Sequence, residues 1–354
     1  MPSRVARKFW AAVAVMLIAP ATSSRAMGQA SSLPPSNKEL VGRLQARPTV
    51  SSSLGQPPDR EDEVGPILIR DQSKRWLFKV GLRLEAVEGP VQKAVASVAV
   101  PIEWPEQQVR LVDVEKPLGV AVQIRRVGGT AEQMILRLPS MSVGDTATCV
   151  RTYEITRWTQ RLNSQVRDQL RPSSVAAVRP YLRPSPGIES SHAEIRKFAE
   201  EALGDATDTM DRIERLFRAT RERVSYVEGD FGGALVGLRS GRGDCEERSC
   251  LFIALCRASG VPARLVRAPH HAWAEVALST PDVELAWVPG DASMSPQFGV
   301  LPNLLPIVQK GDRFSLPEFG AGDVPYLSPR CSGAGIAPRL QLIEELEEHA
   351  DESK

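Results

Sequence analysis

The chain contains few residues of the types that carry chemistry, and several common signatures are missing. Only four of its 354 residues are histidine and five are cysteine. Five cysteines are too few for a disulfide framework, although Cys149 and Cys331 remain free to pair. The sequence shows no metal-ligand spacing, no glycine-rich phosphate loop and no internal repeat. It therefore predicts neither a metal nor another cofactor.

An excess of charge is also missing. The 44 basic and 43 acidic side chains leave a net charge of +1, with 42% hydrophobic residues. This balance gives no reason to expect a nucleic acid or an anionic membrane as a partner. The composition is that of an ordinary globular protein with room for two domains, and its oligomeric state is left open.

The first 30 residues have the pattern of a signal peptide. A basic start precedes the apolar run 9–21, which is too short for a comfortable membrane span, and Ala26 and Ala30 end usable cleavage sites. We expect an exported protein, periplasmic or extracellular, with no stable membrane insertion after signal cleavage. An uncleaved membrane anchor is the alternative.

The next two segments differ in their patterning. Residues 31–65 are rich in Ser, Pro and charge, and we interpret them as a disordered linker. Residues 66–163 contain alternating apolar positions, as in Val80, Leu82 and Leu84, separated by turn signals. This pattern predicts an all-β, sandwich-like domain, which is expected to be structural or to position a large substrate.

The remainder divides into three parts. Residues 164–190 form a proline-containing connector, and 191–300 hold the chemical motifs. The latter part begins with two amphipathic helices at 191–203 and 208–224. Residues 301–354 are expected to be a C-terminal extension. A short acidic helix is predicted at 339–349, because Leu340, Ile343 and Leu346 would share one side.

The motif-bearing part centres on a cysteine at a predicted helix start. Asp244 is a good N-cap residue, and Glu247 three positions later completes a capping box. Cys245 would then be the first helical residue, where the helix dipole favours a thiolate. The adjacent carboxylates oppose that effect, so a histidinium partner is needed. Cys250 and Cys256 fall on the buried part of the helix and are interpreted as core residues.

Two further residues complete a possible thiol site. Strands are expected at 263–267, at 272–278 and at 285–287 running into Asp291. His271 would begin the second of these strands. A thiol at a helix start, a base on the sheet and a carboxylate at the next strand form a papain-type arrangement. His270 is a rival candidate for the base, and a turn role is the alternative for Asp291.

The motifs together resemble the bacterial transglutaminase-like superfamily. The resemblance covers roughly residues 181–292 and rests on four blocks in the family's order: Gly243-x-Cys245, the run 255–264, His271-Ala272-Trp273-x-Glu275-Val276, and Trp287-x-x-x-Asp291. It implies a Cys245–His271–Asp291 triad. It also implies an α+β protein, with a papain-like transglutaminase-type catalytic domain preceded by an all-β sandwich-like domain.

The implied activity is acyl transfer on amide bonds of protein or peptide substrates through a thioester. Water as acceptor would make the protein a cysteine protease or amidase, and an amine would make it a transglutaminase; the sequence does not separate these. Glu246 follows Cys245 where the animal enzymes have tryptophan, which weakens transfer of their crosslinking activity. The alternative is a protein that is not an enzyme: an inactive transglutaminase-like binding or scaffold protein.

Overall fold

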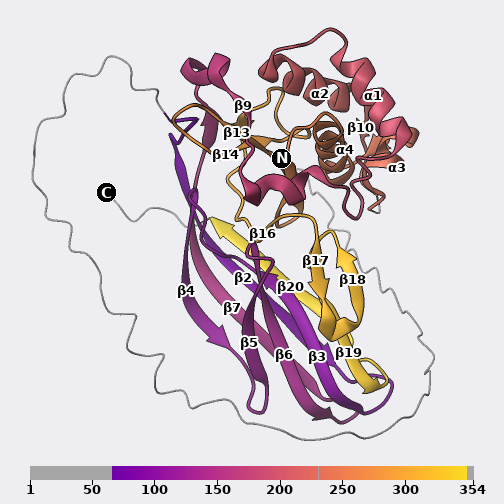
Figure 1. The fold of residues 1–354 in the computed structure, drawn as a ribbon. Helices are drawn as coiled ribbons and strands as arrows, with labels where there is room; N and C mark the ends of the chain where they lie inside the picture. The colour runs from indigo at the N-terminus through magenta and orange to yellow at the C-terminus, as the bar shows by residue number, and fades with distance from the viewer. Residues whose placement is uncertain (1–65, 230, 349–354) are drawn as a thin grey trace, which may run out of the picture. The chain divides into compact units, whose positions relative to one another are not determined.

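Alternating apolar residues build two facing sheets in the first part of the described chain. The computed structural model describes residues 66–229 and 231–348, so the predicted signal peptide (1–30) and linker (31–65) lie outside the described residues. Phe78, Val80, Leu82 and Leu84 of β2 (Ser73–Glu85) are buried. They pack against alternate residues of the opposite sheet in one apolar core. Figure 1 shows the strands of the two sheets. The predicted β-rich region is therefore present, and the mixed α and β class is confirmed.

The two sheets differ in size. The smaller has the strand order β20 (Arg339–Glu348), β2, β7 (Thr146–Trp158) and β4 (Gln107–Glu115). The larger sheet has nine strands. Seven of them have the order β14 (Ala286–Gly290), β13 (His271–Ser279), β12 (Ala263–Ala268), β16 (Gln309–Lys310), β6 (Ala131–Met141), β3 (Val91–Val100) and β19 (Arg330–Gly335). In addition, β5 (Ala121–Val127) pairs with β6, and β9 (Arg171–Pro172) pairs with β13.

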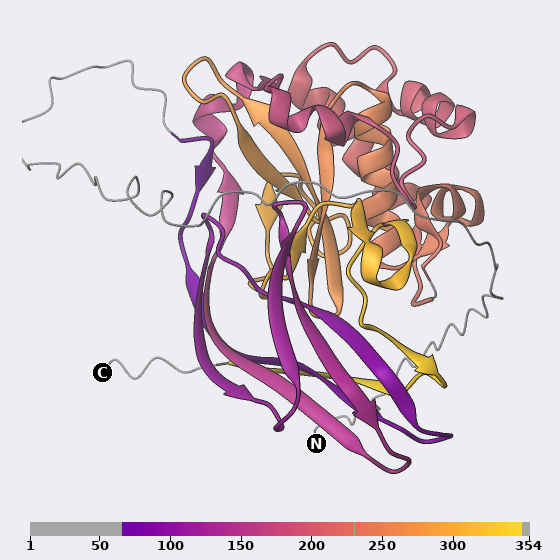
Figure 2. The same ribbon diagram turned by 60° about the horizontal axis from the view of Figure 1, so that its bottom comes forward.

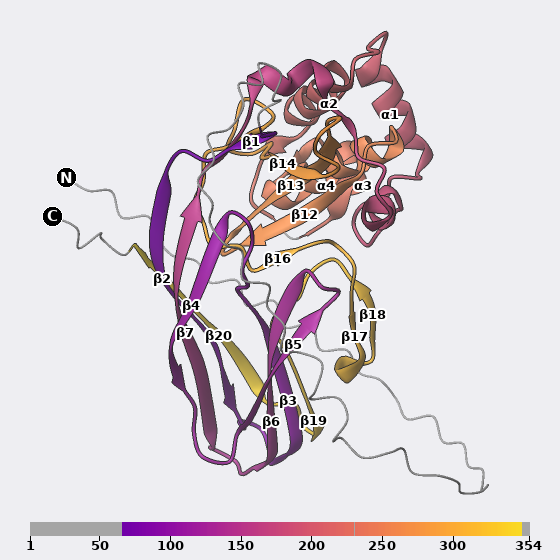
Figure 3. The same cartoon turned by 60° about the vertical axis from the view of Figure 1, so that its left-hand side comes forward.

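The short strand β16 joins the motif-bearing strands to the sandwich. It pairs with β12 on one side, and Gln309 pairs with Ala131 of β6 on the other. Figure 3 shows β16 between β12 and the sandwich strands. Hydrogen bonding is therefore continuous from β14 to β19, across the predicted boundaries at 163 and 300, and those boundaries remain predictions.

Four helices cover the strands that carry the motifs. The predicted amphipathic helices are confirmed as α1 (Ala193–Leu203) and α2 (Thr209–Arg223). They are followed by α3 (Gly233–Ser240) and α4 (Cys245–Ala258). Helix α4 packs on β13 and is contacted by the other three helices, so most of its side chains are buried (Figure 2). No helix in residues 66–229 and 231–348 is long and apolar enough to cross a membrane.

Shorter elements connect these layers. The predicted connector 164–190 contains two 3-10 helices and β9. The remaining short elements are β1 (Leu68–Ile69), β8 (Gln160–Leu162), η2 (Ser164–Gln169), η3 (Ala176–Leu182), β10 (Ser225–Tyr226), β11 (Arg242–Gly243), β15 (Val300–Leu301), β17 (Phe314–Leu316), η4 (Pro317–Phe319) and β18 (Ala321–Val324).

The prediction of an acidic helix at 339–349 is wrong, because residues 339–348 form the edge strand β20. The segment has apolar residues at both helical and alternating spacing, and the partner strand selects the second. Leu340 and Leu346 lie opposite the buried Leu84 and Phe78 of β2. The predicted C-terminal extension thus supplies strands to both sheets.

Candidate active site

A capping box places Cys245 at the first position of α4. The Asp244 carboxylate accepts a hydrogen bond from the backbone N–H of Glu246 at 2.7 Å, and the Glu247 carboxylate accepts one from that of Asp244 at 3.0 Å. Glu247 also accepts the N–H of Gly232 at 2.8 Å, which ties the loop before α3 to the start of α4. The predicted capping box is confirmed.

Gly243 is required where the chain enters α4. A Cβ added there would lie 2.4 Å from the Cβ of Glu247, which is closer than real side-chain carbons approach. Gly243 also pairs with Tyr226 in the two-residue ladder between β10 and β11. The glycine in the Gly-x-Cys block therefore lets the capping glutamate fold back over the chain.

The thiol of Cys245 is 7% exposed and lies among opposing charges. Burial, which is the largest effect, and the carboxylates of Asp244 and Glu246 together raise its pKa to about 12. The backbone N–H of Ala272, which donates to the thiol, and the Arg267 guanidinium act in the opposite direction. The favourable helix start does not outweigh these effects. The thiol consequently needs an adjacent base to become a nucleophile.

His271 stands at the first position of β13, directly before the residue that contacts the thiol. Its Nε2 lies 2.8 Å from Oδ2 of Asp291, and the ring is 8% exposed. Nδ1 is therefore the nitrogen left to accept a proton. Among residues 66–229 and 231–348, no hydrogen bond joins the His271 ring to the Cys245 thiol. The contact between Ala272 and that thiol nevertheless brings the two residues into one site.

Asp291 is fully buried and accepts four hydrogen bonds. Its Oδ2 accepts from His271 and from Nδ2 of Asn303 at 3.1 Å, and its Oδ1 from the backbone N–H groups of Ser293 at 3.1 Å and Met294 at 3.0 Å. Burial alone would raise its pKa, but the hydrogen bond and charge of His271 and the two N–H donors lower it. Asp291 is therefore an ionised carboxylate that orients His271.

Asn303 is a residue of the site that the sequence reasoning missed. It is 7% exposed and lies beyond the predicted catalytic segment 191–300. Its Oδ1 accepts the backbone N–H of Leu305 at 3.4 Å, which helps to hold the amide toward Asp291. The surrounding run Leu301-Pro-Asn-Leu-Leu-Pro has no periodicity and no family motif, so nothing local indicated this role.

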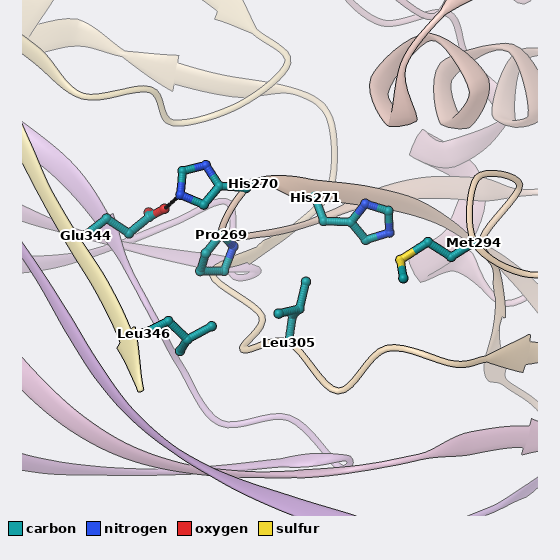
Figure 4. Close-up of a pocket in the computed structure, with 7 residues that line it drawn as sticks. All are labelled: Pro269, His270, His271, Met294, Leu305, Glu344 and Leu346. Atoms are coloured by element: carbon teal, nitrogen blue, oxygen red, sulfur yellow. Dashed lines mark ion pairs between the residues drawn. The ribbon is translucent and has the colours of Figure 1, made fainter. Parts of the chain in front are cut away.

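His270, the rival candidate for the base, has a different environment. Its backbone has a φ of 56°, in the left-handed region, and its side chain is 86% exposed. The ring lies 3.2 Å from the carboxylate of Glu344. Figure 4 shows the rings of His270 and His271 pointing in different directions, toward Glu344 and Met294 respectively.

The other cysteines and Tyr226 have contrasting environments. Cys250 and Cys256 are fully buried, as predicted, and all five cysteines are free thiols, so Cys149 and Cys331 are not paired. Tyr226, by contrast, is 52% exposed and near enough to Cys245 for the thiol's charge to raise its pKa, after the larger effect of burial.

Arg264 and Glu275 belong to a buried ionic network behind the site. The guanidinium of Arg264 donates to Glu275 at 2.6 Å and stacks on Trp287, 3.8 Å from the ring centroid. Lys310 of β16 donates to Glu275 at 2.6 Å and to Glu106 at 2.5 Å. Both residues are thus held in buried ion pairs behind the site.

No group of three or more His, Cys, Asp and Glu side chains in the described ranges is arranged to hold a metal ion. The arrangement present can instead support proton transfer. A carboxylate orients an imidazole, and the residue after that histidine contacts a thiol at a helix start.

Residues 196–292 match the family model of the Transglutaminase-like superfamily. This match confirms the resemblance to the transglutaminase-like superfamily that the four motif blocks predicted. No curated protein matches the chain.

A solved structure shares the fold at low sequence identity, and two others were matched with low TM-scores. A candidate cysteine protease from Cytophaga hutchinsonii superposes with a TM-score of 0.58 at 16% identity, covering 81% of this chain and 94% of its own. A candidate protease from Parabacteroides distasonis has a TM-score of 0.25 at 12% identity, covering 64% and 48%. The periplasmic domain of TgpA from Pseudomonas aeruginosa has a TM-score of 0.29 at 14% identity, covering 62% and 90%. The first likeness extends over the sandwich as well as the superfamily core; the other two do not establish a shared fold.

Proposed function

We propose that the protein is an exported, thiol-dependent acyl-transfer enzyme that acts on amide bonds of protein or peptide substrates. The observation that carries the proposal is the His271–Asp291 hydrogen bond, at 2.8 Å, together with the contact of the next residue, Ala272, with the thiol of Cys245 at the start of α4. The cysteine-protease description of the neighbour with the 0.58 TM-score supports a hydrolytic acceptor. Transamidation to an amine uses the same residues and is the second possibility.

In this mechanism Nδ1 of His271 takes the proton of Cys245 as the sulfur attacks the substrate carbonyl carbon. The carbonyl π pair moves to oxygen, and the backbone N–H of Cys245 donates to that oxyanion. When the carbon–nitrogen bond breaks, His271 returns the proton to the leaving amine, which leaves a thioester on Cys245. A water molecule or an amine then attacks the thioester and gives its proton to His271. The carbon–sulfur bond breaks, the acid or the new amide is released, and His271 returns the proton to the sulfur of Cys245. Asp291 holds the ring and stabilises the imidazolium throughout.

Three alanine variants and one control test this assignment. With peptide hydrolysis and amine incorporation as assays, Cys245→Ala and His271→Ala should remove essentially all turnover. Asp291→Ala should retain roughly two orders of magnitude more activity than His271→Ala, since the orienting carboxylate is the least costly member of a comparable triad. The ring of His270 is exposed and lies outside the triad, so His270→Ala should leave catalysis by the triad intact.

Turnover by Cys245→Ala at the wild-type rate would refute the thiol mechanism. Loss of activity in His270→Ala with His271→Ala unaffected would show that the base is misassigned. A folded wild type without hydrolysis or amine incorporation on any peptide pool would favour the inactive scaffold alternative.

A further inference from the structure

A cavity of about 450 Å³ lies against the outer side of His271 (Figure 4). Apolar side chains from three separate segments form its walls: Met294, Leu305 and Leu346. Its polar lining comes from His271, His270 and Glu344. Cys245 does not line it, so the cavity adjoins the imidazole of His271 and not the thiol.

Glu344 stands where the sandwich pattern calls for an apolar residue. In the β2–β20 pairing, Leu342 lies opposite Leu82, Glu344 opposite Val80, and Leu346 opposite Phe78. Residues opposite each other share a sheet face, so Glu344 is a carboxylate on the core-facing side of β20. An inward charge on an edge strand can also serve to block edge pairing. That explanation does not account for a cavity in front of the carboxylate.

The charge of Glu344 is only weakly compensated. Its side chain is 19% exposed, and burial raises its pKa. Within the part of the chain that the structure describes, its one ion-pair partner is His270, whose ring is 86% exposed. Arg267 is near enough to oppose the effect of burial, but its guanidinium is bound to Glu246. A carboxylate in an apolar cavity with a displaceable partner is suited to bind a cation.

The position of the cavity decides which part of a substrate would enter it. In acyl transfer the imidazole protonates the leaving nitrogen, so the leaving amine must lie on the imidazole side of the thiol. A cavity lined by His271 and not by Cys245 is therefore on the leaving side of the scissile bond. Lysine and arginine combine an apolar stem with a cationic end, which matches apolar walls with one carboxylate.

We propose that this cavity is a specificity site for a basic side chain on the leaving-amine side of the scissile amide. The stem packs on Met294, Leu305 and Leu346, and the cation pairs with Glu344 in place of His270. The inference rests on the proposed acyl-transfer function. It makes β20, a strand from the end of the chain, part of the substrate-binding surface.

A cleavage profile tests this directly. Peptides made with a glutamate-specific protease, which leaves lysine and arginine internal, are digested with wild type, Glu344→Gln and Glu345→Gln, and the new ends are mapped by mass spectrometry. Glu345 is the matched control, because it is the adjacent exposed residue of β20 and pairs with Lys79. Wild type and Glu345→Gln should enrich lysine and arginine just after the cut. Glu344→Gln should lose that preference about tenfold or more, as expected for a lost charged partner, and Glu344→Lys should favour acidic residues there.

A binding measurement separates failure of this inference from failure of the proposed function. N-acetyl-lysine methylamide, added to Cys245→Ala protein, should shift the ring resonances of His270, while the norleucine analogue should not. The shift should vanish in the Cys245→Ala, Glu344→Gln double variant. Equal profiles for wild type and Glu344→Gln, or no shift with the lysine probe, would overturn the cavity assignment. Inactivity with a preserved shift would instead overturn only the acyl-transfer function.

Discussion

At the scale of single residues, Cys245 combines a favourable helix position with an unfavourable environment. The first turn of α4 contributes a positive dipole end, but burial, Asp244 and Glu246 together hold the thiol in its protonated form. In the proposed mechanism, reactivity at neutral pH therefore depends on His271 and not on the helix alone. This dependence is measurable without knowing the substrate.

Alkylation by iodoacetamide as a function of pH is the first prediction. Wild-type Cys245 should react below the free-thiol pKa of about 8.5, because His271 accepts its proton. In His271→Ala the midpoint should rise above that of the wild type, because burial and the carboxylates of Asp244 and Glu246 then act on the thiol without a base to accept its proton. Cys250 and Cys256, fully buried, should stay unlabelled in the folded protein, and His270→Ala should keep the wild-type profile. Equal labelling of wild type and His271→Ala at pH 7 would contradict this view of the thiol.

Asn303 should act as a positioning residue through Asp291. A hydrogen bond to a charged group contributes about 1.5–3 kcal/mol, so Asn303→Ala should lower kcat about tenfold with little change in KM. Losing this donor raises the pKa of Asp291, which moves the acidic limb of the kcat profile to higher pH. Asn303→Asp should be worse, since it places a second carboxylate beside the first.

The matched control for Asn303 is Asn163→Ala. Asn163 is also buried, but it donates to the carbonyl of Pro66, away from the site. The Asn163→Ala variant should affect stability without moving the pH profile of kcat. If both variants give the same kinetics, Asn303 has only a structural role.

At the scale of elements, β16 couples the superfamily core to the sandwich through charge as well as through backbone pairing. Lys310 contacts Glu106 and Glu275, and all three side chains are almost fully buried. Removal of one member leaves carboxylates buried without their cation. The network is therefore a sensitive point of the fold.

Lys310→Met should lower the free energy of unfolding by about 3–5 kcal/mol, the usual cost of breaking a buried ionic group. Lys79→Met removes a more exposed cation, 3.3 Å from Glu345, and should cost less than about 1 kcal/mol. Urea unfolding followed by circular dichroism measures both. If Lys310→Met lowers the free energy of unfolding by less than Lys79→Met does, the network adds no stability.

The same network predicts a pH dependence. Burial raises the pKa of Glu106, but Lys310 and Arg157 outweigh it, so the folded pKa lies below the ordinary 4.5. The folded state then binds this proton less tightly than the unfolded state, and the contribution is lost as pH falls below about 4.5. In Lys310→Met burial acts with less opposition, so acidification should narrow the stability gap between variant and wild type. A gap that widens between pH 7 and pH 4 would contradict this sign.

At the scale of the whole molecule, the N-terminal segment carries the remaining prediction. The basic start and the short apolar run 9–21 predict cleavage during export. N-terminal sequencing of the exported protein should find a start between Met27 and Ser32. An intact Met1 on the exported protein would show an uncleaved anchor instead.

The parts of the site and fold that depend on residues close together in the sequence could be predicted. The capping box spans Asp244 to Glu247, and its hydrogen bonds form within one helical turn, so sequence spacing alone places Cys245 at the helix start. The blocks around His271 and Asp291 carry the family resemblance, and they lie on adjacent strands. The alternation of Val80, Leu82 and Leu84 likewise indicates a buried strand without knowledge of its partners.

The rest required tertiary structure, because its cause lies far away along the chain. Whether residues 339–348 form a helix or a strand depends on β2, more than 250 positions earlier, whose apolar face pairs with Leu346. Asn303 and Glu344 have no motif, and only chain packing brings them to Asp291 and His270. The sequence by itself determined that Cys245 begins a helix and indicated the family resemblance. The folded chain decided which distant groups bind Asp291 and line the cavity, since those contacts depend on packing rather than on spacing.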